Sequence, residues 1–357
     1  WLSDNAAFIK ASHDAARNHA DTLERGAEYK KYLVPGSEEF KAAFNKIVTT
    51  KSNKRTDEEA GTQFFDRSAL YHMQGEYKFT PTFMESIVVG GSARHYRPNS
   101  QGTIFYDTSD VKITNTEFGV YLGGEKKLIG SKLKLNATIR ADKNQNFNAL
   151  FSPAFSAVYN PSENNFLRLS FSSALRNPTL TDQFLFLNVG PAILSGNLNG
   201  AQDLITVESF SDFTEKLDRT QLKYFNIAGV RPEKVKTMEI GYRTTLFNNT
   251  YIDGSYYYSR YNDFLGYVIG IKSDFDPLTS FPQNIQAYRY AANSVNQVTT
   301  QGFSVGLNHY FMDHYMLAGN YSWNKLNKLD VDDPIIPAFN TPEHKYNISL
   351  SGRDMNA

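Results

Sequence analysis

Few side chains in this 357-residue sequence have a spacing suited to catalysis. The chain has no cysteine, which excludes disulfides, thiolate metal sites and cysteine nucleophiles. His13 and His19 are six residues apart on a weakly helical segment, so they do not share a helix face and are interpreted as solvated side chains. Gly91-Ser92 lacks the strand–turn–helix context of a nucleophile elbow. The sequence therefore predicts no catalytic residue and a protein that is not an enzyme.

The best candidate for a cation site in the sequence is a group of three aspartates, Asp330, Asp332 and Asp333. Carboxylates at this spacing resemble a fragment of a calcium loop, but the glycine and the closing glutamate of such a loop are missing. The sequence therefore predicts no metal site and no bound cofactor.

Arginine and tyrosine side chains on alternating strands are better candidates, because they could contact a polar ligand. Residues 132–142 are apolar at every odd position and polar at every even position, which predicts a strand with one oily face and one wet face. The same parity places charged residues of the neighbouring strands on the wet face. The candidate ligand-binding residues near one end of that face are Arg94, Arg140, Arg176, Tyr257 and Tyr261.

Period-two alternation holds from about residue 70 onward and predicts about eleven strands of roughly 9 to 14 residues, longer than the usual mode of about 5 to 6 in globular sheets. The predicted strands are 71–79, 86–97, 113–126, 132–142, 148–159, 167–176, 234–247, 250–262, 299–311, 314–325 and 344–352. The connections alternate between tight turns rich in Pro, Gly, Asn or Asp and long loops. The long loops are 98–112, 177–233, 263–298 and 327–343, and only 143–147 is short on that side. Apolar clusters in 177–233 predict that this loop folds over the end from which it projects.

Composition narrows the class of protein further. Lysine plus arginine and aspartate plus glutamate number 37 each, and this balance argues against a nucleic-acid binder. Aromatic residues reach 14%, yet no run approaches the roughly 18 to 20 apolar residues of a membrane-spanning helix. A membrane strand needs an apolar residue only at every second position, and aromatic residues such as Tyr77, Phe247 and Phe311 lie near the tight turns, where an interfacial girdle belongs. The alternative is a soluble antiparallel β protein, a sandwich or propeller, acting as an extracellular ligand-binding protein.

Three segments carry a family resemblance. They are 151–184, with Ser152-Pro153, Tyr159-Asn160-Pro161, Arg168 and Arg176-Asn177-Pro178; 230–243, with Pro232-Glu233 and Glu239-Ile240-Gly241; and 340–345, Asn-Thr-Pro-Glu-His-Lys. In order and spacing they resemble the barrel of TonB-dependent outer-membrane receptors. The amino-acid sequences of the three segments are most similar to those of receptors of the Bacteroidetes type. The resemblance covers about residues 68–352.

The resemblance implies an all-β fold: an antiparallel up-and-down membrane β-barrel of which about half of the 22 strands are present. It also implies energy-coupled uptake, across the bacterial outer membrane, of an external ligand: a siderophore or cofactor, or an oligosaccharide or peptide taken from a surface lipoprotein. The implied partners are outer-membrane lipid, the small ligand and the TonB complex. The plug and the TonB box are not recognisable in this stretch, so TonB would be reached through a plug outside it.

Residues 1–67 differ from the rest of the chain. Ser37-Glu38-Glu39 followed by apolar residues at helical spacing predicts a helix over about 40–48. We therefore expect two parts, a helical and polar extracellular loop insertion at 1–67 and a partial outer-membrane barrel at 68–357.

Overall fold

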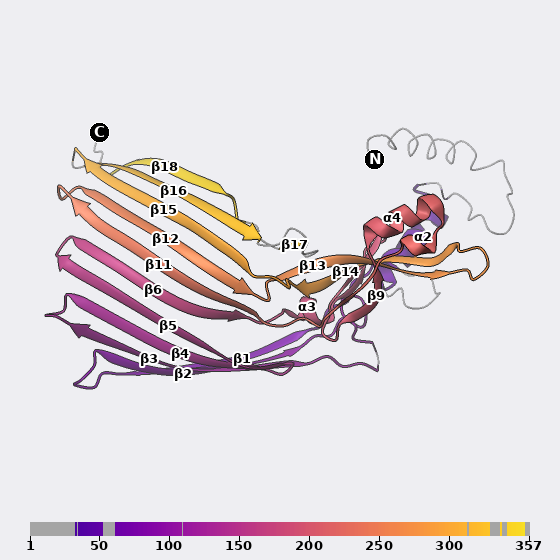
Figure 1. The fold of residues 1–357 in the computed structure, drawn as a ribbon, viewed down its shortest axis with the longest axis horizontal. Helices are drawn as coiled ribbons and strands as arrows, with labels where there is room; N and C mark the ends of the chain where they lie inside the picture. The colour runs from indigo at the N-terminus through magenta and orange to yellow at the C-terminus, as the bar shows by residue number, and fades with distance from the viewer. Residues whose placement is uncertain are drawn as a thin grey trace. The chain divides into compact units, whose positions relative to one another are not determined.

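The computed structural model describes residues 33, 35–52, 61–108, 110–312, 314–328, 336–337 and 341–353. His13, His19 and Asp330–Asp333 lie outside these residues. The chain forms two compact units, residues 1–66 and residues 67–357 (Figure 1). Among the described residues, none of the helices has the length and apolar character needed to cross a membrane.

The described part of the first unit contains helix α2, Glu38–Thr49. Ser37 is its N-cap, and the Ser37 hydroxyl accepts a hydrogen bond from the Phe40 amide at 3.1 Å. The negative charges of Glu38 and Glu39 in the first turn interact favourably with the positive end of the helix dipole. The predicted helix is thus confirmed. The assignment of 1–67 as an extracellular loop stays a prediction.

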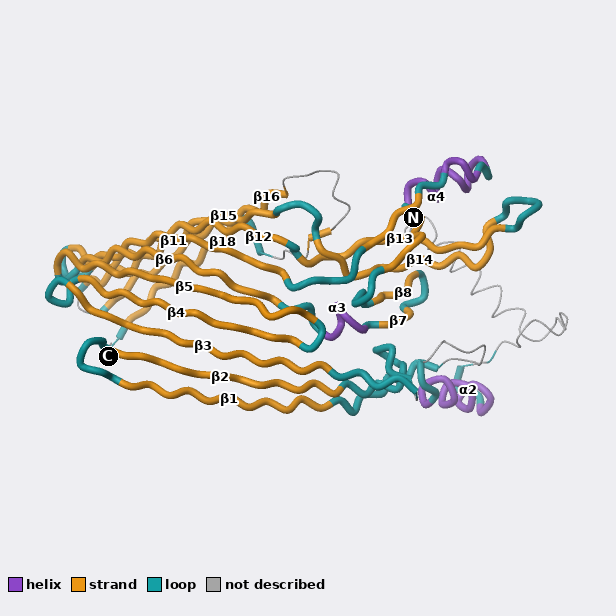
Figure 2. The backbone as a smooth tube through the Cα atoms, turned by 60° about the horizontal axis from the view of Figure 1, so that its bottom comes forward, coloured by secondary structure: helices purple, strands orange, loops and turns teal. Residues whose placement is uncertain are grey.

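The second unit contains an eleven-stranded antiparallel sheet in the order β1-β2-β3-β4-β5-β6-β11-β12-β15-β16-β18. Its strands are β1 Ala69–Phe79, β2 Ser86–Arg97, β3 Asn115–Leu128, β4 Leu133–Asn144, β5 Phe147–Ser162, β6 Asn165–Arg176, β11 Glu233–Leu246, β12 Thr250–Asn262, β15 Val298–Phe311, β16 Tyr315–Lys328 and β18 His344–Gly352. All eleven predicted strands are confirmed, and they lie side by side as a curved sheet (Figure 2). Within the described residues β1 and β18 each pair on one side only, so the sheet is open, as half a barrel would be.

The register of this sheet separates two faces. We call the side that carries Arg140 the polar face and the side that carries Ile139 the apolar face. Cross-strand partners share a face, so the polar face also carries Glu76, Lys78, Arg94, Glu117, Asp142, Arg168, Arg176, Glu239, Arg243, Asp253, Tyr257 and Tyr261. This is the parity that the sequence predicts.

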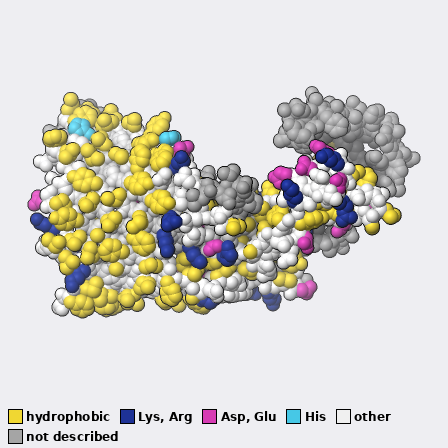
Figure 3. All heavy atoms as spheres, in the orientation of Figure 1, with side chains coloured by type: hydrophobic (Ala, Val, Ile, Leu, Met, Phe, Trp, Pro, Cys, Tyr) yellow, Lys and Arg dark blue, Asp and Glu magenta, His cyan; other side chains and the backbone are white. Residues whose placement is uncertain are grey.

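The apolar face is exposed and free of charge in the middle of its strands. Val120, Ile139 and Ile240 are 62%, 50% and 51% exposed, and apolar side chains cover much of the sheet in Figure 3. Its basic residues, such as Lys126, Lys143 and Lys234, lie near strand ends. A continuous exposed apolar surface of this kind is typical of a face that contacts a membrane or another protein.

A second sheet forms from the loops 177–233, 263–298 and 327–343, in the order β10-β9-β13-β14-β8-β7 with β17 paired to β13. Its strands are β7 Phe186–Asn188, β8 Ala192–Ser195, β9 Ala201–Ile205, β10 Tyr224–Ile227, β13 Leu265–Phe275, β14 Pro282–Asn293 and β17 Ile336–Pro337. Short helices accompany it: α3 Leu180–Phe184, α4 Val207–Lys216 and a 3-10 turn, Arg219–Gln221. The predicted loop 263–298 is therefore wrong, because most of this segment is a long hairpin of β13 and β14.

Burial in the second unit is concentrated in this second sheet. Ile205, Phe210, Phe213 and Ile271 form a buried cluster, in which Phe213 is fully buried. Phe213 meets the Phe275 ring edge-on at 5.3 Å. Since β9 and α4 come from one loop and β13 from the other, this core joins the two loops into one folded body.

Candidate ligand-binding site

A cavity of about 800 Å³ opens on the polar face near the ends of β2 to β6 that lead into the long loops. Its walls combine polar side chains of the strands with the residues that follow β6. They include Arg94, Asn115, Glu117, Thr138, Arg140, Asp142, Asn177, Thr179 and Thr181. Two of the five predicted ligand-binding residues, Arg94 and Arg140, are thus brought together.

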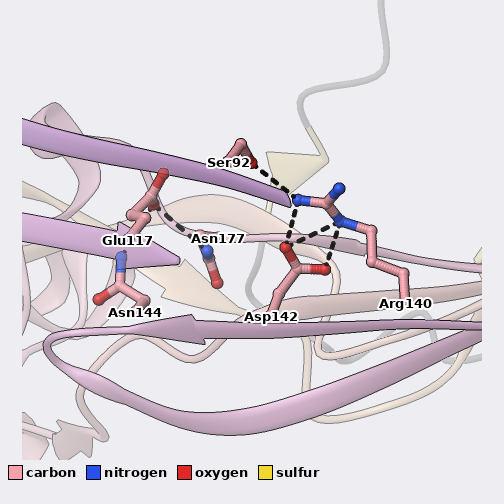
Figure 4. A network of polar contacts seen from close by, with 6 residues as sticks. All are labelled: Ser92, Glu117, Arg140, Asp142, Asn144 and Asn177. Atoms are coloured by element: carbon pink, nitrogen blue, oxygen red, sulfur yellow. Dashed lines mark hydrogen bonds and ion pairs between the residues drawn. The ribbon is translucent and has the colours of Figure 1, made fainter. Parts of the chain in front are cut away.

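Arg140 is held by its neighbour on the same strand face, Asp142. The Arg140 Nε donates to both Asp142 carboxylate oxygens, at 2.9 and 2.8 Å, and Nη2 donates to Oδ1 at 2.7 Å (Figure 4). Arg140 Nη2 also reaches Ser92 Oγ at 3.4 Å, and the guanidinium lies 5.8 Å from the Tyr121 ring centroid. A bidentate pair of this kind fixes the arginine and offsets its charge.

Gly119 makes room for this pair. It lies opposite Asp142 in the register, and a Cβ at Gly119 would lie 2.0 Å from Arg140 Nη2. Any side chain there would displace the guanidinium, so the glycine allows Arg140 to lie flat against the strand.

Glu117 connects three segments around the cavity. It accepts hydrogen bonds from Asn144 Nδ2 at 2.9 Å and from Asn177 Nδ2 at 3.3 Å (Figure 4). Asn144 ends β4, and Asn177 follows β6, so one carboxylate ties the tops of β3, β4 and β6 together.

Two polar groups in the cavity are available to a ligand, the Arg94 guanidinium and the Asn115 side-chain oxygen. Arg94 is opposite Glu117 in the register but, among the residues that the structure describes, makes neither an ion pair nor a side-chain hydrogen bond. Asn115 is 2% exposed, and its Oδ1 accepts no hydrogen bond from any described residue. A buried acceptor without a donor is costly, so a cation and an acceptor here are available to a bound group.

The other three predicted residues lie elsewhere on the polar face. Arg176 Nη1 is 3.9 Å from the Glu233 carboxylate, which also accepts the Leu265 amide at 2.9 Å. Tyr257 donates to Asn324 Oδ1 at 2.8 Å, and Tyr261 meets Phe264 edge-on at 5.3 Å. None of the three lines the cavity. Their assignment as ligand-binding residues stays a prediction.

Sequence reasoning did not identify Asn115, Asn177, Thr179 or Thr181 as cavity residues. Asn115 is the first residue of β3, and the other three follow the end of β6, so strand alternation gives no signal for them. The Arg176-Asn177-Pro178 motif was the available clue. Thr179 caps α3 through a reciprocal pair of bonds with Asp182, which fixes this wall of the cavity.

The loop after β2 is locked by a buried carboxylate. Asp107 accepts hydrogen bonds from the Ser100 amide and hydroxyl and, at 3.0 Å, from the Gly102 amide. The same loop contacts the second sheet, because Phe105 bridges to Leu185 and the Tyr106 ring meets Phe186 edge-on at 5.8 Å. Asp107 therefore connects the strands around the cavity to the loops beyond them.

An Asp107→Ala variant is expected to loosen this loop, because it leaves two buried amides without an acceptor, at about 1 to 3 kcal/mol each. Hydrogen exchange followed by mass spectrometry should show faster exchange of the peptide containing Ser100 and Gly102, by about tenfold or more. Asp110→Ala, at an exposed position of the same loop, is the control and should exchange normally. Equal protection in both variants would contradict the role of Asp107.

Aromatic side chains stiffen the second sheet. The rings of Tyr288 and Tyr290 stack at 5.4 Å, and the Arg289 guanidinium lies 4.8 Å from the Tyr267 ring centroid. Burial, and to a lesser degree the neighbouring Tyr288, raises the pKa of Tyr290 to about 12. Within the described residues no cluster of His, Asp or Glu could hold a metal ion.

Several solved structures are similar to this chain in fold. The solved structures include the ferric enterobactin receptor PfeA of Pseudomonas aeruginosa, as a mutant in complex with enterobactin, with 14% identity and a TM-score of 0.57 over 81% of this chain and 40% of that one. The FrpB iron transporter of Neisseria meningitidis has 15% identity and a TM-score of 0.55 over 81% and 41%. The siderophore receptor PirA of Pseudomonas aeruginosa has 15% identity and a TM-score of 0.50 over 74% and 44%.

At these identities the likeness concerns the fold, and the chain spans less than half the length of each of these receptors. No curated protein matches the chain. The family described as TonB dependent receptor-like, beta-barrel matches residues 4–354, nearly the whole sequence. The chain therefore belongs to the β-barrel of the TonB-dependent receptors, a family of receptors and transporters of the bacterial outer membrane and not of enzymes.

Proposed function

We propose that this protein is part of an outer-membrane receptor that captures an anionic external ligand in the cavity beside Arg94 and passes it through the barrel in an energy-coupled step. The observation that carries the proposal is the combination of Arg94, which makes no described ion pair, with the buried and unsatisfied Asn115 Oδ1 in one cavity. A ligand with a negative group and a neighbouring N–H or O–H donor would satisfy both.

A siderophore complex is the ligand class that the relatives favour. PirA is named a siderophore receptor, FrpB an iron transporter and PfeA a ferric enterobactin receptor. Oligosaccharide or peptide uptake with a surface lipoprotein has no comparable support among them. Membership of the receptor family confirms that the chain is not an enzyme.

The energy-coupling partner in this proposal is TonB, which family members contact, and the lipid partner is the outer membrane around the apolar face. Contact with TonB through a plug, and origin in a Bacteroidetes organism, stay predictions. The alternative of a soluble extracellular binding protein is disfavoured, because it gives no reason for an apolar face that is exposed and free of charge in the middle of its strands.

An Arg94→Ala variant of the complete receptor is expected to bind its ferric siderophore about tenfold more weakly, because it removes a cation of the cavity that no described carboxylate pairs with, worth about 1.4 kcal/mol. Arg140→Ala is expected to weaken binding less, because the Arg140 charge is already offset by Asp142. Equilibrium binding of the radiolabelled ferric siderophore to outer-membrane preparations measures both.

Lys78→Ala is the matched control, since Lys78 lies on the same polar face but near the opposite, tight-turn end of its strand. It should bind normally. Normal binding by Arg94→Ala would mean that the cavity does not receive the ligand.

A further inference from the structure

Asn197 lies at a junction between the cavity wall and the second sheet. It comes two residues after β8 and is 3% exposed. Its backbone amide donates to the Asp182 carbonyl of α3 at 2.8 Å, and its carbonyl accepts the Val230 amide at 2.7 Å. Thr179 and Thr181 of the cavity wall are the N-cap and the second residue of α3, where the chain passes from β6 into the second sheet (Figure 2). The backbone of Asn197 therefore holds the helix that carries this wall.

The side-chain amide of Asn197 reaches two further segments. Its Nδ2 donates to the Ala228 carbonyl at 2.8 Å and to the Ala291 carbonyl of β14 at 2.9 Å. Both partners are acceptors, so only the amide nitrogen can face them. The Asn197 Oδ1 is buried and accepts no hydrogen bond from any described residue, which is costly. Asparagine is nevertheless suited to this position, because no other side chain of its size carries two donors on one atom.

The backbone around Asn197 is closely packed. A Cβ at Gly196 would lie 2.4 Å from the Phe184 backbone nitrogen, and a Cβ at Gly229 would lie 2.3 Å from the Leu198 carbonyl oxygen. The end of α3 and the two glycine segments are thus in backbone contact. Because such packing is nearly incompressible, a shift of one segment is transmitted to the others.

The other side of α3 is tied to the eleven-stranded sheet. The Gln183 side chain is 3% exposed, accepts a hydrogen bond from Asn146 Nδ2 at 2.7 Å and donates to the Pro178 carbonyl at 2.7 Å. Asn146 lies in the short turn between β4 and β5. The helix thus has fixed contacts with the strands on one side and, through Asn197, with the second sheet on the other.

We infer that Asn197 couples the second sheet to the ligand cavity, so that the affinity of the cavity depends on the docking of the β13–β14 hairpin. The inference rests on the proposed function, in which the ligand binds in this cavity. Asn197 is a positioning residue: it holds α3 against β14, and α3 presents Thr179 and Thr181 to the ligand. Because coupling between two sites is reciprocal, a ligand held by this wall also stabilises the hairpin at Ala291.

An Asn197→Asp variant of the complete receptor tests the coupling, because aspartate has nearly the same shape but sets a carboxylate oxygen against two carbonyls. A nitroxide spin label at Thr181→Cys reports the motion of α3, and one at Thr138→Cys, on β4 in the same cavity, reports the strands. The spectrum of the receptor without the added cysteine is subtracted. The mobile component should rise at position 181 and stay unchanged at 138, and this measurement needs no ligand.

Asn188→Asp is the matched control for the same substitution in the second sheet. Asn188 Oδ1 accepts the Gly190 amide at 2.9 Å, and a carboxylate accepts that bond equally well. Neither label should change its motion in this variant.

Ligand affinity is the second readout. The probe is radiolabelled ferric enterobactin, the ligand for which the similar PfeA is named. Equilibrium binding should be about tenfold weaker for Asn197→Asp. It should be about threefold weaker for Asn197→Ser, which keeps one donor and carries the test if the aspartate variant fails to assemble.

Unchanged label motion at position 181, an equal rise at 181 and 138, or normal affinity of both Asn197 variants would overturn the coupling. Arg94→Ala shows how far such a failure extends. If Arg94→Ala binds weakly while the Asn197 variants bind normally, only the coupling is wrong. If all three variants bind normally, the proposed function is wrong as well.

Discussion

An Ile139→Arg variant of the complete receptor is expected to fail in membrane assembly. Ile139 is 50% exposed, lies in the middle of β4 and faces the apolar side, where its cross-strand neighbours are Leu122 and Pro153. Arginine on the lipid face near the bilayer midplane costs about 2 to 4 kcal/mol. The heat-modifiable folded band of outer-membrane preparations should be strongly reduced.

Asn136→Arg is the matched control, three residues earlier on the same strand but on the polar face. It lies opposite Glu125, which already pairs with Lys134 at 2.9 Å, and it faces the polar side, away from lipid, so assembly should be normal. Normal assembly of Ile139→Arg would show that the apolar face does not contact lipid. Failure of both variants would show only that β4 tolerates no arginine besides Arg140.

A Phe213→Ala variant is expected to unfold the second sheet while the eleven-stranded sheet stays folded. Phe213 is fully buried among Phe210, Ile205 and Ile271, and truncation of such a phenylalanine costs about 3 to 5 kcal/mol. Because that core joins two loops, both should become sensitive to protease. Ligand uptake should be lost with them, since the same loops lie next to the cavity wall at Thr179 and Thr181.

Limited proteolysis, gel mobility and uptake of the ferric siderophore on the same preparations separate these effects. Val207→Ala, at a half-exposed position of the same helix α4, is the control and should resist protease. If the protease cleaves both loops of the Phe213→Ala variant but the variant still takes up ligand, the second sheet is not needed for capture. If neither loop is cut, the core does not hold them together.

The membrane strands were predictable because their signal is local. A side chain faces lipid or the interior according to whether its position in the strand is odd or even, and the tight turns mark where each strand ends. The segment 132–142 can therefore be predicted as a strand without knowledge of its neighbours. The same parity placed Arg94 and Arg140 on one face.

The second sheet was not predictable in the same way. Its pairing joins residues far apart in the sequence, as in the parallel pair of β14 with β8, where Tyr288 pairs with Ile193. Alternation cannot show which loop segment meets which, because the energy comes from a shared core rather than from one face against lipid. The sequence therefore predicts only a loop over 263–298, where the structure has a long hairpin.

The cavity shows the same division between local and tertiary information. The sequence by itself determined that this chain is a stretch of barrel strands with an apolar and a polar face, because lipid imposes the same period on every strand. Only the tertiary structure decided which polar residues act together. Asp142 engages Arg140, Glu117 engages Asn144 and Asn177, and Arg94 is left without a described partner beside Asn115. Those pairings depend on distances between strands and loops, which parity along one strand does not contain.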